Sequence, residues 1–246
     1  MMRRNLAGLL LAAGLTGSFA LAQSTDSADP YLWLEEVHGD AALAWAKEKS
    51  QLALAGFKGD PAYQPNYDAV LGILDAQDRI PMGTLRGRNV YNFWRDAVHV
   101  KGIWRRTTLG SYRTPNPEWE TLLDVDRLAA DEGKNWVYAG ASCLPDETRC
   151  LISLSPGGTD AMVVREFDLA SKTFPAGGFV VPESKSDVAF ASAGTFLVAS
   201  DFGPGSMTKS SYPRVVKEWR RGTQLGEART LYEGTVDDIG VSPFVA

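Results

Sequence analysis

The chain of 246 residues carries 25 basic and 30 acidic side chains and a formal net charge of −5 at neutral pH. This acidic balance disfavours nucleic acid and anionic membranes as binding partners. With 44% hydrophobic and 10% aromatic residues, the chain has enough apolar material for a folded core, which excludes the disordered class. Its length allows one large all-β domain or two smaller domains.

Residues 1–22 have the pattern of a secretory signal peptide. Arg3 and Arg4 precede an apolar run that ends at Ala22 with the sequence Ala-Leu-Ala, a small-x-small pattern of the kind that signal peptidase cleaves. Polar residues without a basic flank follow the run, so it does not resemble a membrane anchor. We expect cleavage between Ala22 and Gln23 and an exported protein, periplasmic or secreted, with no membrane-embedded part.

Residues 23–80 have a helical pattern. Asp40 is a plausible N-cap for a helix over Ala41–Ala55, and Gly56 is a plausible stop. A second helix is expected after Asn66, because the apolar residues that follow it recur at the i, i+3, i+4, i+7 spacing of one helical face. The sequence therefore predicts a short α-helical segment ahead of the β-rich part.

From residue 81 to residue 246 the sequence has the texture of short strands bounded by turn residues. Similar strand openings recur roughly every 46–52 residues, and each unit ends in a similar closing segment, a period typical of propeller blades. The openings stand at Asn89, Asn135, Ser186 and Asp238, and the closing segments begin at Trp119, Phe179 and Ala228. The expected fold is mainly β: a partial β-propeller of about three four-stranded blades and the start of a fourth.

A β-sandwich is the competing architecture, because its short strands also come at regular spacing. A sandwich does not require one unit to resemble the next, however. In this sequence the strand order, the closing segment and the turns all recur, so the propeller is favoured.

The two cysteines, Cys143 and Cys150, flank the segment LPDETR. If Pro145–Thr148 forms a four-residue hairpin loop, the two cysteines face each other across the hairpin and are close enough to form a disulfide. Export would supply the oxidising compartment that a disulfide needs. The alternative is a pair of separate buried thiols in adjacent strands.

Three segments resemble the prolyl oligopeptidase family. DPYLWLEEVHGDAALAW (29–45) is similar to the start of the mature family proteins, and two further segments are similar to the first and third blades of its exported bacterial branch. These are GSYRTPNPEWETLLDVDRLA (110–129) and SDFGPGSMTKSSYPRVVKEWRRGT (200–223). The resemblance implies a helical N-terminal segment, a seven-bladed propeller and a C-terminal α/β-hydrolase domain. In the family the propeller acts as a filter that admits short peptides to a serine nucleophile.

The catalytic residues of that family cannot be placed on this sequence. The nucleophile of an α/β-hydrolase lies in a G-x-S-x-G elbow, and neither Ser142 nor Ser206 has glycines at both required positions. His38 and His99 lack a candidate nucleophile beside them. We therefore expect no catalytic residue in this chain.

We also expect no cofactor site and no metal site. The acids of 124–132 and 236–238 lack the glycine-centred spacing of a calcium loop, so solvated turns are the favoured interpretation. The glycine-rich stretch at Gly203 lacks the lysine of a phosphate loop. The basic clusters after Trp104 and Glu218 recur at equivalent positions and suggest arginine stems packed against neighbouring strands.

Two functional hypotheses follow. In the first, the chain is the N-terminal propeller part of an exported serine peptidase that acts on short peptides, and it ends before the α/β-hydrolase domain that would be its main partner. Such a chain would be inactive alone. In the second, it is a non-enzymatic propeller fragment that binds a partner or assembles with copies of itself. Open propeller edges are an aggregation hazard, which favours the first hypothesis.

Overall fold

The computed structural model describes residues 29–36, 38–76 and 78–245. The expected signal peptide and its cleavage site between Ala22 and Gln23 lie outside these residues. The chain divides into two compact units, Met1–Val70 and Leu71–Ala246, and we describe each by itself. The first strand begins at Thr84, close to the residue at which the sequence changes from a helical to a β texture.

The first long helix, α1, extends further than the sequence predicts. A short 3-10 helix, η1 (Leu32–Glu35), precedes it, and α1 covers Asp40–Gly59 with Gly39 in the N-cap position. The helix runs through Gly56, because a glycine in a helix costs only about 1 kcal/mol relative to alanine. It ends at Asp60, which is extended, since the proline that follows disfavours the helical conformation of the preceding residue.

The second helix, α2, covers Tyr63–Leu74, so Asn66 lies inside the helix and does not cap it. Pro65 falls in the first turn, where its missing N–H has no intrahelical partner to lose. Within the described residues, no helix combines the length and the apolar character needed to cross a bilayer.

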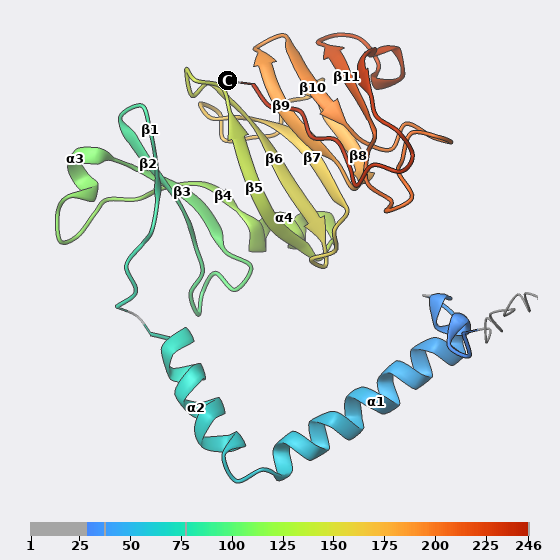
Figure 1. Cartoon of the computed structure of the whole chain (residues 1–246). Coiled ribbons are helices and arrows are strands. Elements are labelled where there is room, and N and C mark those ends of the chain that lie inside the picture. Colours follow the sequence, from blue (N-terminus) through green and yellow to red (C-terminus); the bar gives the residue numbers. More distant parts are fainter. Residues whose placement is uncertain (1–28, 37, 77, 246) are drawn as a thin grey trace, which may run out of the picture. The chain divides into compact units, whose positions relative to one another are not determined.

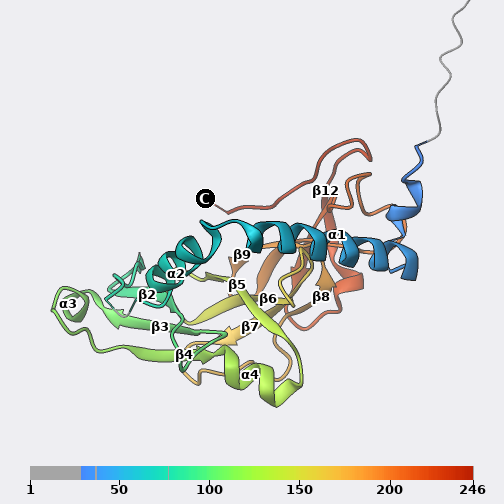
Figure 2. The same cartoon turned by 90° about the horizontal axis from the view of Figure 1, so that it is seen from below.

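Residues 78–245 form twelve strands in three four-stranded antiparallel sheets, which lie side by side in chain order (Figures 1 and 2). The first sheet contains β1 (Thr84–Arg86), β2 (Asn89–Trp94), β3 (Ile103–Thr108) and β4 (Glu120–Asp124). The second contains β5 (Trp136–Cys143), β6 (Arg149–Pro156), β7 (Met162–Asp168) and β8 (Val180–Ser184). The third contains β9 (Asp187–Ser192), β10 (Thr195–Ala199), β11 (Val215–Arg220) and β12 (Arg229–Glu233).

Short helices connect parts of these sheets. They are α3 (Leu109–Tyr112), α4 (Val125–Glu132) and the 3-10 helix η2 (Leu225–Glu227). Each sheet pairs its four strands in sequence order, as a propeller blade does. The expected mainly β fold with repeated four-stranded units is confirmed, and the sandwich alternative does not fit three consecutive sheets.

Two details of the strand assignment were wrong. Asn89 opens the second strand of the first sheet, because the three-residue strand β1 precedes it and pairs with it around a turn at Gly87, where φ is 52°. With β1 as the first strand, the three sheets begin at Thr84, Trp136 and Asp187, and their spacing becomes nearly even. The strand expected from Asp238 does not form in the described residues; the backbone N–H of Val241 instead donates to the carbonyl of Pro213.

The core consists of two apolar clusters, one between the first and second sheets and one between the second and third. Strand β6 contributes to both, because successive side chains of a strand point to opposite faces. Cys150, Ile152 and Leu154 belong to the first cluster, and Leu151 belongs to the second. All four are at most 1% exposed, so the second sheet is covered on both faces.

The hairpin between β5 and β6 has the register that the cysteine spacing predicts. Cys143 is the direct partner of Cys150, and the two sulfur atoms form a disulfide. Beyond this pair, the N–H of Leu144 donates to the carbonyl of Arg149 at 2.9 Å. The disulfide therefore closes the base of a short loop whose tip carries Glu147, a residue with φ of 55°.

The disulfide predicts a measurable stability difference between the oxidised and the reduced chain. Closing a loop of this length reduces the entropy of the unfolded chain by an amount worth roughly 2–3 kcal/mol. Denaturant unfolding with and without reductant measures the difference, and a Cys143→Ser/Cys150→Ala double variant, which should not respond to reductant, is the control. Two alkylatable thiols in protein isolated from an oxidising compartment would contradict the bridge.

Candidate functional site

A cavity of about 360 Å³ lies between the first and second sheets, where β1 and β2 face β5. Gly83 is one of its lining residues, and a Cβ at this position would lie 2.5 Å from Cγ1 of Val90 and 2.9 Å from the carbonyl oxygen of Tyr91. Only glycine allows the chain to pass so close to β2. The carbonyl of Met82 accepts a hydrogen bond from Nδ2 of Asn92 at 2.6 Å, which ties the segment before β1 to β2 at the cavity.

Aromatic rings form much of the cavity wall. The rings of Phe93 and Tyr138 stack at a centroid distance of 4.4 Å with an interplanar angle of 10°. Tyr91 stacks on Trp104 at 5.6 Å, and Trp104 lies 6.3 Å from Tyr138. Such pairs contribute about 0.5–1.5 kcal/mol beyond the apolar area they bury, so this wall also joins the first sheet to the second.

The polar side chains that line the cavity include Arg86, Tyr91 and Tyr138, together with Thr84 and Asn92. Burial raises the pKa of Tyr138, although the charge of Arg86 lowers it in part. Burial and a hydrogen bond to Glu147 raise the pKa of Tyr91. Both phenols therefore stay protonated at neutral pH and can donate a hydrogen bond.

Glu147 connects the disulfide-closed hairpin of the second sheet to the first sheet. Its Oε2 accepts hydrogen bonds from Nδ2 of Asn89, at 2.9 Å, and from the hydroxyl of Tyr91. Asp146 orders the same hairpin tip, because its carboxylate accepts from the backbone N–H and the hydroxyl of Thr148 at 3.0 and 2.8 Å. These bonds hold the pKa of Asp146 below its usual value.

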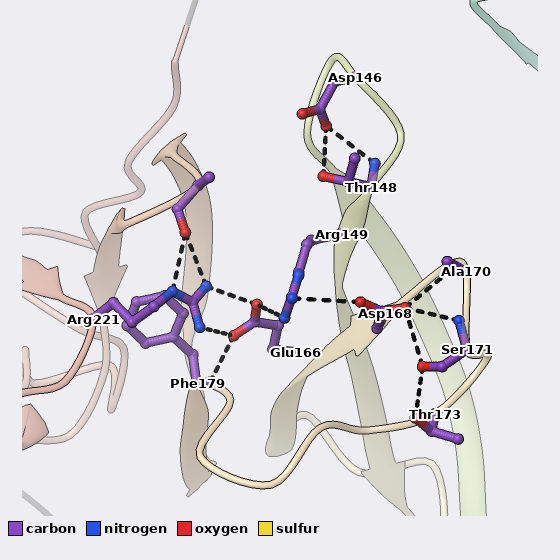
Figure 3. Close-up of polar contacts among 11 residues, drawn as sticks. Asp146, Thr148, Arg149, Glu166, Asp168, Ala170, Ser171, Thr173, Phe179 and Arg221 are labelled. Carbon is purple, nitrogen blue, oxygen red and sulfur yellow. Dashed lines mark hydrogen bonds and ion pairs between the residues drawn. The ribbon is translucent and has the colours of Figure 1, made fainter.

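A second polar cluster lies between the second and third sheets and centres on Glu166 of β7 (Figure 3). The side chain of Glu166 has no exposed surface. Arg221, which follows β11, donates to both of its oxygens at 3.0 and 2.7 Å, and Arg149 of β6 donates at 3.0 Å. The backbone N–H of Phe179 adds a fourth bond at 2.9 Å.

Arg221 is itself fixed in place by several contacts. Its guanidinium lies 4.6 Å from the ring centroid of Phe179 and donates to the carbonyl of Ala193. Arg149 also pairs with Asp168, at 3.4 Å. The network therefore joins side chains of two sheets around one buried carboxylate, which is the condition under which an ion can be buried without a large net cost.

The pKa of Glu166 lies below its ordinary value. Burial acts in the opposite direction and raises the pKa, but the hydrogen bonds from Arg221, from the N–H of Phe179 and from Arg149 outweigh it. Glu166 is therefore ionised at neutral pH, and its ion pairs contribute to stability in the folded state.

The serine and histidine residues considered from the sequence do not come together in a catalytic arrangement. The hydroxyl of Ser206 donates to Asp201 and to the carbonyl of Gly203 and orders a turn. Nδ1 of His99 lies 3.0 Å from Oδ1 of Asp96, and backbone and side-chain hydrogen bonds from His99 lower the pKa of Asp96 to about 2. His38 is exposed, and Ser142 lies in β5.

The acids of 124–132 were expected in solvated turns, and this was wrong. They belong to α4 and its N-cap: Asp124 accepts from the N–H of Arg127, and Asp126 accepts from the N–H groups of Lys101 and Gly102. Glu132 accepts from Nε1 of Trp136. Among the residues that the structure describes, no three histidine, cysteine, aspartate or glutamate side chains are placed to hold a metal ion.

The basic clusters after Trp104 and Glu218 do lie at equivalent positions, in the third strands β3 and β11. Arg105 packs its guanidinium 4.5 Å from the ring centroid of Trp94 and 4.3 Å from that of Trp119. The role of Arg221 in the Glu166 network was missed. The recurrence of the basic cluster indicated a structural role for Arg221, but nothing in the sequence identified Glu166 as its partner.

The network predicts that Arg221→Met destabilises the chain by about 2–3 kcal/mol, because it leaves a buried carboxylate with one arginine fewer. Arg220→Met is the matched control. Its side chain is 71% exposed, so its removal should change the free energy of unfolding by less than about 0.5 kcal/mol. Urea denaturation of both variants measures this difference, and equal effects would contradict the assigned role.

The pKa of Glu166 predicts a pH-dependent contribution to stability. A carboxyl with a lowered pKa in the folded state contributes stability above its unfolded value of about 4.3 and loses it as the pH falls through the folded value. Glu166→Gln should therefore be less stable than the native chain at pH 7, with a difference that shrinks in acid. Glu183→Gln, at an exposed position of β8, is the control; a difference for Glu166→Gln that does not change with pH would exclude the mechanism.

Comparisons with known proteins agree with this architecture. The family model for the N-terminal β-propeller domain of prolyl oligopeptidase matches residues 18–241. Two curated relatives are peptidases described as uncharacterised: y4nA of Sinorhizobium fredii is 43% identical over 218 residues, and RP174 of Rickettsia prowazekii is 33% identical over 219 residues. They cover 88% and 85% of this chain, which matches 30% of each relative.

A solved structure of a post-proline cleaving enzyme from Rickettsia typhi is similar to this chain with a TM-score of 0.78 and 33% sequence identity. The similarity covers 86% of this chain and 32% of that enzyme. The chain thus spans about a third of the length of the relatives that it matches. With the family model matched over nearly the whole chain, it belongs to the prolyl oligopeptidase family, and its three sheets are part of the N-terminal β-propeller domain.

Proposed function

We propose that the chain is the propeller part of an exported serine peptidase that acts on short peptides. Its three sheets would form a wall that limits access to a catalytic triad located on an α/β-hydrolase domain outside this chain. The chain alone would then have no peptidase activity. The observation that carries this proposal is the match of residues 18–241 to the propeller domain of a peptidase family.

The geometry of the sheets supports a role in admitting substrates. The first strands of neighbouring sheets lie close together: β5 contacts β9, and the cavity joins β1 and β2 to β5. The last strand, β12, is exposed along its length. The first strands would therefore line the interior of the completed propeller, where they would meet any peptide that passes through it.

The expectation that the protein is exported rests on the signal-like pattern of residues 1–22, and the Cys143–Cys150 disulfide supports it. Disulfides persist in oxidising compartments and are rare in the cytosol. The relative from Rickettsia typhi is described as cleaving after proline, so proline-containing peptides are the first substrates to test.

The purified chain should not react with a fluorophosphonate probe and should not cleave a chromogenic peptide that contains proline. That chemistry requires an activated nucleophile and a base, which the proposal places outside the chain. Activity-based labelling and an absorbance assay measure both outcomes. Covalent labelling of a serine above background would contradict the proposal.

A chimaera tests whether this chain can serve as the propeller part of an active peptidase. Residues 23–246 would replace the matching segment of the y4nA peptidase, which is 43% identical, with unaltered y4nA as the control. If the sheets serve the same role, the chimaera should label and cleave within about tenfold of y4nA, which corresponds to a barrier change of roughly 1.4 kcal/mol. A chimaera that is folded but unreactive would favour a non-enzymatic binding module.

A further inference from the structure

Arg86 differs from the other half-buried arginines of the three sheets. Its backbone pairs with Asn89 in the β1–β2 ladder, but among the described residues its guanidinium forms no hydrogen bond and no ion pair. Each of the others has a carboxylate or amide partner: Arg105 with Asn92, Arg106 with Glu120, Arg149 with Glu166, Arg165 with Glu132, and Arg214 with Glu233. A half-buried guanidinium without a partner has lost part of its hydration without compensation, which suggests that its partner is a ligand.

The hydroxyl of Tyr138 is a second unused donor in the same cavity. It has no hydrogen-bond partner among the described residues. Tyr138 and Arg86 line the same cavity, and the guanidinium charge lowers the pKa of Tyr138 in part. Glu147 reaches the same edge of the first sheet, but Asn89 and Tyr91 occupy its carboxylate. The cavity therefore holds a cation and a neutral donor, a combination that suits a carboxylate.

Most of the remaining cavity wall is apolar. The stacked rings of Phe93 and Tyr138 and the indole of Trp104 line it. Thr84 and Asn92 are the polar exceptions, and the side-chain amide of Asn92 already bonds the carbonyl of Met82 and Nε of Arg105. The cavity volume of about 360 Å³ lies at the lower end of the range of ligand pockets, roughly 300–1,000 Å³. The space suits one or two residues of a peptide. An inorganic anion would leave the aromatic surface unused.

We propose that this cavity binds the C-terminal residue of a short peptide, with the free carboxylate on Arg86 and Tyr138 and an apolar side chain against the aromatic wall. A C-terminal residue carries its carboxylate and its side chain on one Cα, so both can reach their partners together. A glutamate or aspartate side chain carries no apolar group beyond its carboxylate, so it could not also pack against the aromatic wall. The choice of a peptide rests on the proposed function; the carboxylate site rests on the cavity itself.

The test is calorimetric titration of the 246-residue chain with acetyl-Ala-Phe and with its C-terminal amide. The free acid should bind and the amide should bind at least about tenfold more weakly, because the amide cannot form the charge-assisted pair with Arg86. Arg86→Met should weaken binding of the acid by a similar factor, and Tyr138→Phe by a smaller one. Arg88→Met, which removes the same charge from an exposed side chain two residues away, should leave binding unchanged.

Several results would overturn the proposal. These are equal binding of acid and amide, equal effects of Arg86→Met and Arg88→Met, and no saturation up to about 10 mM peptide. Tighter binding of acetyl-Ala-Glu-amide than of acetyl-Ala-Phe would assign the site to acidic side chains, and equal competition by inorganic phosphate would make it a general anion site. Thermal unfolding distinguishes a binding role of Arg86 from a structural one. Arg86→Met should not lower the midpoint of thermal unfolding, whereas Arg221→Met should. The titration involves no cleavage, so its failure would leave the result of the chimaera intact.

Discussion

The packing of the second and third sheets depends on the buried, ionised carboxylate of Glu166. Burying such a charge is costly unless opposite charges and hydrogen bonds compensate it. Here Arg221 arrives from beyond β11 and Arg149 from β6, and the N–H of Phe179 completes the set. The third sheet therefore has one favourable position against the second, because a small displacement would separate Arg221 from Glu166.

Another glutamate, Glu147, plays a similar part at the contact between the first and second sheets. Glu147 at the tip of the β5–β6 hairpin binds Asn89 and Tyr91 of the first sheet, and the disulfide limits how far that hairpin can move. Apolar clusters drive both contacts, but hydrophobic burial is non-directional. The charge-assisted hydrogen bonds of Glu147 and Glu166 are directional, so they fix the orientation of neighbouring sheets. Both glutamates belong to the second sheet or its β5–β6 hairpin, one bonding to the first sheet and the other to the third.

Much of this architecture could be predicted from the sequence, because it follows from local periodicity. The positions of the later blades and the pairing of Cys143 with Cys150 depend on strand alternation and on one hairpin loop, both of which are local. Strand β1 was missed because three residues are too few to show a period. The limits of α1 were missed because Pro61, rather than Gly56, ends the helix.

The two polar sites could not be predicted in the same way, because their partners come from different sheets. The run VVREFD in β7 does not alternate regularly between apolar and polar residues. A charged residue such as Glu166 is expected to face solvent, and nothing in the local sequence shows that the third sheet covers it. Arg86 stands in a turn-rich segment beside Gly87, and its neighbour Tyr138 is distant in sequence. Sequence periodicity describes which face of a strand a residue occupies, but it does not describe what lies against that face.

The double coverage of β6 has an evolutionary consequence. A strand with one solvent-facing side can accept substitutions at every second position, whereas β6 has almost no position that faces only water. Deleting a single buried methylene there costs about 1 kcal/mol, and compensation would require a matching change in one of two different sheets. Among related sequences, β6 should therefore diverge most slowly and the fully exposed β12 most rapidly. Substitution rates would then differ strongly between strands of the same domain.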